Sequence, residues 1–505
     1  MGLKEQLIIS KLRVIVRMKN NKKRKKVIVM GAGLAGLACA YELSQKKFDV
    51  VIIEKWEEVG GLARTIKKGK FSFDSGPHRW YTKSNMVNKW MLDLLGDEVI
   101  RVPRLTRIYF DKKFFYYPIK LKNAIGGIGL WRAVRSVLDY LIARVKSRLL
   151  KPKLVTMEDG YVNQFGHTLY ETFFKRYSEK LWGVPCDRIS VDWIGQRTRG
   201  LNLSTILKEM IIKSKKVVSL VDEFSYPERG IGRIAEKMAD TVKKYGGEIL
   251  LNSEVVEIER RENQITSVTV KVSGKEKKIE GDYFISSIPI NDLVFRLSPE
   301  TDRSIYALSK KLKYRDELQV ALFVSKTHIT PDTWIYVHSK EIPFMRLMEM
   351  DNWSDKLSPV GTTTLVFEIA CNEGDAMWNK NDKDVIDLVK KSFVEEFSLI
   401  PYKTITGGYV HRVPKEYPVY HIGYRQDVDK IKKYLSGFFN LQLIGRNGTF
   451  RYNNMDHSIE MGLYAAWNLI SGKKKHDIES VNIEREYLEE KKFESPEDEF
   501  VEEKH

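Results

Sequence analysis

Short apolar runs bounded by glycine or charged residues mark the start of the chain. Residues 27–30 are all apolar and predict a buried strand, and residues 50–53 predict a second one. An Ala- and Leu-rich run between them, ending near Ser44, predicts a helix. Strand, helix and strand in this order are typical of a parallel α/β unit, so we expect a Rossmann-type sheet in this part of the chain.

The apolar pattern changes several times after this unit. Residues 104–117 alternate as strands do, and a helical pattern then extends to about Ser219. Strand patterns return at 246–289, 318–369 and 404–413. Further helices are predicted at 233–245, 382–398 and 461–470. A chain of 505 residues with this succession is too long for one core, so we expect two or more domains.

Three glycines follow the first predicted strand in the spacing Gly31-x-Gly33-x-x-Gly36. Gly31 suits a tight turn, Gly33 lets the backbone approach a pyrophosphate, and Gly36 lets the helix pack closely on the strand. The N-terminus of the helix adds free N–H groups and the positive end of its dipole. Glu54, which ends the second strand, can accept a hydrogen bond from a ribose hydroxyl. A glycine-rich turn in another α/β protein is the alternative, but strand, helix and acid together favour a dinucleotide site.

Two further motifs extend this pattern, namely Gly60-Gly61 followed by Arg64, and FDSGPH at 73–78. With the glycine motif they resemble the FAD-binding half of the amine-oxidase superfamily of flavoenzymes. That superfamily includes monoamine oxidases, protoporphyrinogen oxidases, phytoene desaturases and UDP-galactopyranose mutases. The resemblance implies FAD as the cofactor. The residues that it assigns to FAD binding are Gly31, Gly33, Leu34, Ala35, Gly36, Glu54, Lys55, Gly61, Leu62, Arg64, Gly76, Pro77, His78, Val255, Gly445, Arg446, Met455, Asp456 and Ser458.

Several segments resemble the UDP-galactopyranose mutase branch in particular. They are residues 76–82, similar to GPHxFHT, residues 174–183, similar to a segment ending YxxKxWG, residues 416–419, similar to a YP turn, and residues 445–456, similar to GRxxxYRYxxMD. Two positions depart from these motifs. Tyr81 stands where the branch has a second histidine, and Phe450 replaces the first tyrosine. These departures leave the substrate open.

The resemblance to the mutases implies an enzyme that acts on a nucleotide-linked sugar through N5 of reduced FAD. It places His78 near the flavin and makes His78, Arg346, Arg451 and Tyr452 the candidate catalytic residues. The candidate substrate-binding residues are Trp182, Arg197, Tyr417 and Tyr420. Each of these side chains also has an ordinary structural interpretation, in a core or in a surface ion pair. The second hypothesis is an oxidoreductase of the amine-oxidase or protoporphyrinogen-oxidase type, which transfers a hydride from substrate to flavin. The sequence alone does not show whether a lysine or an aromatic pair lies opposite the flavin, so both hypotheses stay open.

The superfamily resemblance also implies a discontinuous FAD-binding domain, with a parallel sheet core interrupted by an α+β substrate domain. We expect a basic arm at 1–26, FAD-binding segments at 27–103, 225–300 and 440–475, a mainly helical substrate region at 104–224, a β-rich substrate domain at 301–439 and an acidic tail at 476–505.

Charge is concentrated at the two ends of the chain. Residues 1–26 contain ten Lys or Arg and one acid, which is half of the formal net charge of +18. Such an arm can contact an anionic membrane, but a solvated leader is the more common role, and translation could also begin at Met18. We expect no nucleic-acid partner and no signal peptide, since charges interrupt the apolar residues of 1–17.

Three widely spaced cysteines and nine histidines without ligand spacing predict neither a disulfide framework nor a metal site. The cysteines fit a reducing cytoplasm, and the family resemblance implies a small-molecule substrate. Residues 124–150 carry apolar residues at helical spacing with interleaved arginines. We expect this amphipathic helix to pack its apolar face on its own protein, with an anionic membrane surface as the alternative.

Overall fold

The structure is a computed structural model that describes residues 24–117, 123, 126–127, 129–195 and 223–482. The expectations for most of the basic arm, for much of the acidic tail and for Arg197 lie outside the described residues.

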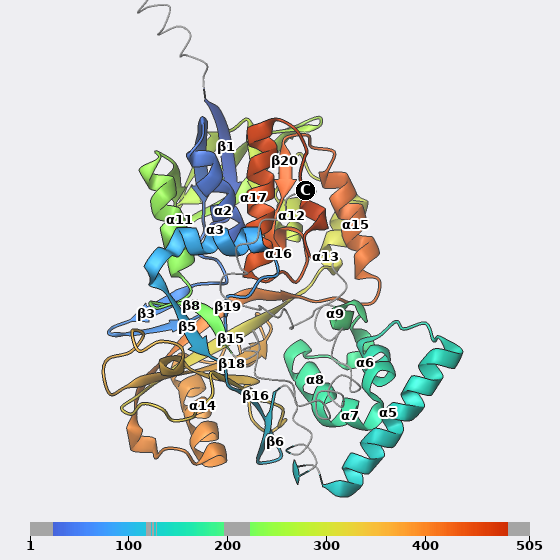
Figure 1. The fold of residues 1–505 in the computed structure, drawn as a ribbon. Helices are drawn as coiled ribbons and strands as arrows, with labels where there is room; N and C mark the ends of the chain where they lie inside the picture. Colours follow the sequence, from blue (N-terminus) through green and yellow to red (C-terminus); the bar gives the residue numbers. More distant parts are fainter. Residues whose placement is uncertain (1–23, 118–122, 124–125, 128, 196–222, 483–505) are drawn as a thin grey trace, which may run out of the picture.

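A five-stranded parallel sheet forms one end of the molecule and confirms the predicted fold class (Figure 1). Its strand order is β20-β13-β1-β2-β9, and every neighbouring pair runs parallel. The strands are β1 (Lys25–Met30), β2 (Phe48–Ile53), β9 (Glu248–Leu250), β13 (Tyr283–Ser286) and β20 (Leu441–Leu443). The sheet therefore combines segments that lie more than 400 residues apart in the chain, as expected of a discontinuous domain.

Helix α2 (Leu34–Ser44) follows β1 and packs against α17 (Met455–Ser471) and α11 (Arg233–Lys244). The contact with α17 is close, because a Cβ atom at Gly462 would lie 2.2 Å from the carbonyl oxygen of Ala35. Helix α17 begins at Met455, six residues before the start that the apolar pattern predicts. Further elements near this sheet are β3 (Thr65–Lys68), β4 (Phe71–Asp74), α3 (Asn85–Leu95), β5 (Val99–Pro103), β8 (Glu223–Pro227), α12 (Ile290–Phe295), α15 (Tyr424–Leu435) and α16 (Gly445–Gly448).

A seven-stranded, mainly antiparallel sheet lies below the parallel one in Figure 1. Its order is β19-β15-β18-β17-β16-β6-β7. The strands are β6 (Thr106–Phe110), β7 (Lys113–Tyr116), β15 (Tyr314–Val324), β16 (Trp334–Val337), β17 (Arg346–Glu349), β18 (Thr363–Cys371) and β19 (Ile405–Pro418). Helix α14 (Asp382–Phe397) covers one face through Val385, Val389 and Phe393. The expected turn at 416–419 is wrong, since β19 extends to Pro418, and Tyr417 and Pro418 pair with β15.

A smaller sheet has the order β12-β11-β10-β14, in which only the β10–β14 pair is parallel. Its strands are β10 (Ser253–Arg261), β11 (Gln264–Val272), β12 (Lys275–Glu280) and β14 (Leu297–Ser298), and α13 (Arg303–Lys311) follows.

Helices between β7 and β8 form a separate group at the lower right of Figure 1. They are α5 (Leu130–Leu150), α6 (Met157–Phe165), α7 (His167–Leu169), α8 (Arg176–Trp182) and α9 (Asp192–Gly195). The expectation that the amphipathic helix buries its apolar face is wrong. Leu138, Leu141 and Val145 of α5 are all exposed, because the helix packs through its opposite side.

Candidate functional site

The chain turns sharply between β1 and α2. Gly31 has φ +100°, and its N–H donates to the carbonyl of Ile53 at 2.8 Å. A Cβ atom at Gly36 would lie 2.1 Å from the carbonyl oxygen of Gly31, so only glycine lets the helix start this close to the strand. Gly33 precedes the first turn of α2 and bridges to Gly60. This arrangement exposes the N-terminus of α2 to a ligand, as the glycine motif predicts.

Glu54, directly after β2, connects the turn after β1 to the loop that follows β2. Its Oε2 accepts from the N–H of Ala32 at 2.7 Å, and its Oε1 accepts from the N–H of Trp56 at 3.1 Å. The carboxylate is therefore fixed in place while both oxygens keep a second lone pair. A carboxylate fixed in this way suits a ribose hydroxyl, the role expected for it.

A groove of about 1270 Å³, part of it open to solvent, extends along these segments. It will be called the cofactor groove. Fifteen of the residues that the resemblance assigns to FAD line it, namely Gly31, Gly33, Leu34, Ala35, Glu54, Lys55, Gly61, Leu62, Arg64, His78, Val255, Gly445, Arg446, Met455 and Ser458. Of the remaining four, Gly76 and Pro77 line a neighbouring groove, Gly36 packs on β1, and Asp456 is buried in the first turn of α17.

The glycines of the cofactor groove fit FAD. A Cβ atom at Gly61 would lie 2.9 Å from the Cα of Gly33, so no side chain fits at Gly61, where the two backbone segments meet. Bare backbone at a helix N-terminus is what a pyrophosphate requires. Arg64 adds a cation to the same wall, and its Nη2 lies 3.2 Å from Nε2 of His411. Burial lowers the pKa of His411 to about 3, so that histidine is neutral beside the arginine.

A second groove of about 1290 Å³ adjoins the first and will be called the polar groove. The two grooves share His78, Arg446, Asn454 and Met455. Four arginines line the polar groove, namely Arg79, Arg104, Arg346 and Arg446. The two grooves therefore meet at these four residues, and a ligand in the polar groove would lie next to one in the cofactor groove.

The sheet supplies one wall of the polar groove. Arg346 and Glu368 are cross-strand partners in β17 and β18, and their side chains form an ion pair through Nε and Oε2. Nη2 of Arg346 also donates to the hydroxyl of Tyr417 at 3.2 Å. Arg346 is buried, so these two contacts hold its guanidinium in one orientation.

Arg446 connects the wall to the cofactor groove. Its Nε donates to the carbonyl of Asn453 at 2.9 Å, and its Nη1 donates to Oε1 of Glu416 at 3.2 Å. Tyr452 lies against the guanidinium and stacks on Tyr417 with 5.8 Å between ring centres. Burial raises the pKa of Glu416 to about 7, while the adjacent Arg446 opposes that shift.

His78 lies where the two grooves meet. Burial, together with the nearby charges of Arg446 and Arg346, lowers the pKa of His78 to about 3. The imidazole is therefore neutral near pH 7 and can act as a hydrogen-bonding group.

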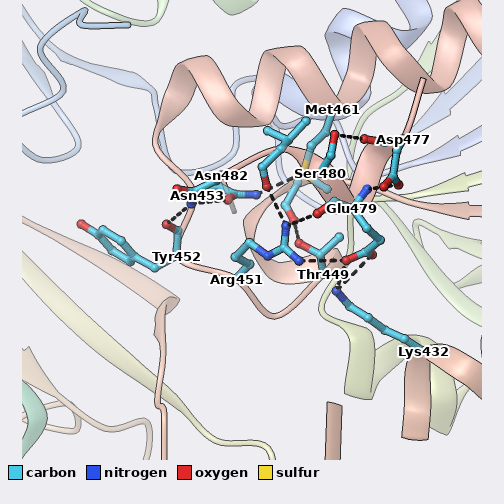
Figure 2. A network of polar contacts seen from close by, with 12 residues as sticks. Lys432, Thr449, Arg451, Tyr452, Asn453, Met461, Asp477, Glu479, Ser480 and Asn482 are labelled. Atoms are coloured by element: carbon cyan, nitrogen blue, oxygen red, sulfur yellow. Dashed lines mark hydrogen bonds and ion pairs between the residues drawn. The ribbon is translucent and has the colours of Figure 1, made fainter. Parts of the chain in front are cut away.

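Three of the expected site residues lie away from both grooves, namely Arg451, Trp182 and Tyr420. Figure 2 shows Arg451 and Tyr452 pointing in opposite directions. Arg451 binds Glu479 through Nη2 at 2.9 Å and donates to the carbonyl of Val481 through Nη1. Trp182 is buried with its ring 4.5 Å from that of Trp193. Tyr420 is also buried, and its hydroxyl accepts from the N–H of Tyr452 at 2.7 Å.

The Arg and Glu residues of the polar groove that the sequence did not predict are Arg79, Arg104, Glu368 and Glu416. Arg79 directly follows the GPH motif, so its position was a usable signal. Glu368 and Glu416 lie within strands, where nothing in the local sequence separates a groove residue from a surface one.

A family model described as flavin containing amine oxidoreductase matches residues 34–404. Coproporphyrinogen III oxidase from Staphylococcus aureus (strain NCTC 8325 / PS 47) is 22% identical over 489 residues, which cover 88% of this chain and 99% of that protein. The 1-hydroxycarotenoid 3,4-desaturase from Flavobacterium sp. (strain P99-3) is 22% identical over 269 residues, 49% of this chain. The match spans about half of the desaturase's length, 54%.

Among solved structures, reduced UDP-galactopyranose mutase has a TM-score of 0.76 with 19% sequence identity. The match covers 91% of this chain and 96% of that one. At this identity the likeness establishes the fold alone.

Proposed function

The chain belongs to the flavin containing amine oxidoreductase family and is an FAD-dependent enzyme, and on this premise we propose that it acts as a mutase on a nucleotide-linked sugar. The observation that carries the proposal is the polar groove. It is lined by four arginines and adjoins the end of the cofactor groove. Guanidinium groups suit paired phosphate oxygens, which are the charged part of a nucleotide-linked sugar.

The four arginines fall into two pairs by position. All four guanidinium groups lie beside aromatic rings, and Arg104 lies 5.3 Å from the ring centre of Trp334. In the proposal Arg79 and Arg104 bind the diphosphate, and the nearby aromatic rings bind the base or sugar. Arg346 and Arg446 are held by Glu368 and Glu416. They orient the sugar at the junction of the two grooves.

FAD in its reduced form would supply a nucleophilic N5 for the anomeric carbon of the sugar. The chain's own part is to position and to neutralise charge. A neutral His78 donates or accepts one hydrogen bond beside the reacting carbon, and it adds no charge there. Tyr452 and Tyr417, which stack on each other, exclude water from the same side.

An oxidoreductase that transfers a hydride from an anionic substrate to FAD is the second candidate. It is favoured by the similarity to coproporphyrinogen III oxidase, which extends over 88% of this chain. The same arginines would then bind substrate carboxylates. Among the described residues, no lysine lines the polar groove, so carboxylate binding there would depend on the four arginines.

Two assays on the purified FAD-containing protein separate the candidates. The first incubates it without oxygen, with dithionite and UDP-galactopyranose, and measures the ring-isomerised product by chromatography. The second adds coproporphyrinogen III to the oxidised protein and follows flavin bleaching and oxygen consumption. Isomerisation that needs reduced flavin supports the mutase proposal.

Bleaching by the porphyrinogen without any isomerisation of the sugar would replace the mutase proposal by the second candidate. Arg104→Gln is expected to weaken whichever activity is found. Arg261→Gln, at an exposed position of β10, is the matched control and should retain it.

A further inference from the structure

Helix α5 exposes a continuous apolar stripe on its outer face. Trp131 is 80% exposed and Leu149 is 77% exposed. Between them, large apolar side chains recur every three or four residues and are also exposed, namely Val134, Leu138, Leu141, Ile142 and Val145. This spacing places them along one side of the helix. Single exposed apolar residues are common, but a stripe of this length marks an interaction surface.

The opposite side of α5 is fixed to the protein by small and polar contacts. Ala133, Ser136 and Tyr140 are buried, and the helix contacts α6 and α7. A Cβ atom at Gly166 would lie 2.7 Å from the carbonyl carbon of Asp139, so the two backbones meet closely. Figure 1 shows α5 at the outer edge of the helical group, and the exposed stripe lies on the side of the helix away from its buried contacts.

Basic residues flank the stripe on both sides. At 100° per residue, Arg132, Arg135 and Lys146 lie along one flank, and Arg144 and Arg148 lie along the other. Asp139 is the one acid of the helix; it lies on the flank of Arg132 and Lys146, and its Oδ2 accepts from the N–H of Thr168 at 3.1 Å. The exposed face of α5 is thus apolar in the middle and positively charged along its edges.

We propose that α5 docks the protein on the surface of an anionic phospholipid bilayer. The apolar stripe would enter the region between headgroups and acyl chains, and the flanking arginines and lysine would contact lipid phosphates. Within the described residues, no helix combines the length and the apolar character that crossing a membrane requires. A second copy of α5 is a poorer occupant, because five basic side chains on each copy would face one another.

Vesicle flotation of the full FAD-containing chain tests this docking. One set of vesicles contains phosphatidylcholine alone, and the other contains equal parts of phosphatidylcholine and phosphatidylglycerol. We expect binding to the anionic vesicles only, and weaker binding as salt is added. The double variant Leu138→Gln, Leu141→Gln should bind on the order of tenfold more weakly, because it removes apolar area without touching a packed residue.

The matched control is Phe439→Gln, since Phe439 is also a large exposed apolar residue, at 69%, and lies on a different element. It should bind as the unaltered chain does.

Tryptophan fluorescence gives a second measure of insertion into the bilayer. Brominated lipid should quench part of the fluorescence of the unaltered chain, and this quenching should be lost in Trp131→Phe. Equal vesicle binding by the chain and the double variant would overturn the proposal, as would no vesicle binding at all. Self-association that the double variant abolishes, without vesicle binding, would instead identify a dimer contact.

Discussion

The guanidinium carbon of Arg446 lies 4.6 Å from the centre of the Tyr452 ring, on the boundary between the cofactor groove and the polar groove. The same guanidinium donates to the carbonyl of Asn453 and to the carboxylate of Glu416. One side chain thus connects the loop after β20, the end of β19 and the position expected for the flavin.

Replacing Arg446 by lysine keeps the charge and removes the forked donor. An ammonium cannot reach Asn453 and Glu416 in the same geometry, and a broken buried pair costs about 3–5 kcal/mol. We expect Arg446→Lys to lose bound FAD on dilution, and its FAD dissociation constant should rise at least tenfold in fluorescence titrations. Arg261→Lys is the control. Unchanged FAD affinity would show that Arg446 does not support the cofactor.

Gly33 and Gly36 should respond differently to alanine. A Cβ atom at Gly33 would meet only the Cα of Gly61 at 3.9 Å, an ordinary contact. Gly33→Ala should therefore fold normally while its methyl group blocks the pyrophosphate. Gly36→Ala should lose about 1–3 kcal/mol of stability, because its Cβ would meet the carbonyl oxygen of Gly31. Thermal unfolding and the flavin absorbance per protein distinguish the two. A Gly33→Ala protein that retains full FAD contradicts the assigned role.

Because folding lowers the pKa of His78, the free energy of unfolding should depend on pH in the acidic range. The unfolded chain binds this proton below pH 6.5, whereas burial lowers the pKa in the folded chain to about 3. Stability from His78 is therefore fully present above pH 6.5 and declines as pH falls toward 3. The measurement is the free energy of unfolding in urea between pH 6.5 and pH 3. For each pH unit of acidification, it should fall by about 1.4 kcal/mol more in the unaltered chain than in His78→Gln. Parallel curves for the two proteins would mean that folding does not lower the pKa of His78.

Arg104 should affect substrate binding more than turnover. In the proposed function it binds the diphosphate, which does not react at phosphorus. A hydrogen bond to a charged group is worth about 1.5–3 kcal/mol, so Arg104→Gln should raise KM for UDP-galactopyranose by about 10–100-fold with little change in kcat. Steady-state kinetics at fixed ionic strength check this split. A large fall in kcat with unchanged KM would place Arg104 at the reacting carbon instead.

The cofactor end of the protein was predictable because its signals are local. Gly31, Gly33 and Glu54 lie in one strand–turn–helix–strand segment, where spacing alone fixes the geometry. The contributions of Gly445 and Arg446 came from the family resemblance. The polar groove was less predictable, since Arg346 and Glu368 meet only through the register of two strands.

Periodicity also does not say which neighbour covers a helix face. The spacing in α5 predicted an amphipathic helix, but it could not show that Ser136 faces inward while Leu138 faces solvent. Likewise, Arg451 and Tyr452 are neighbours in the motif, but their side chains point in different directions. Arg451 binds Glu479, whereas Tyr452 lines the polar groove.

The order of strands in the parallel sheet has a consequence for synthesis. β13 pairs on one side with β1 and on the other with β20, whose residues are Leu441–Leu443. A nascent chain therefore cannot complete this sheet until more than four-fifths of its length has left the ribosome. Pairings over such sequence separations form slowly. The glycine turn at the N-terminus is translated first, yet its groove closes only when the loop with Gly445 arrives, so FAD capture is expected late in biogenesis.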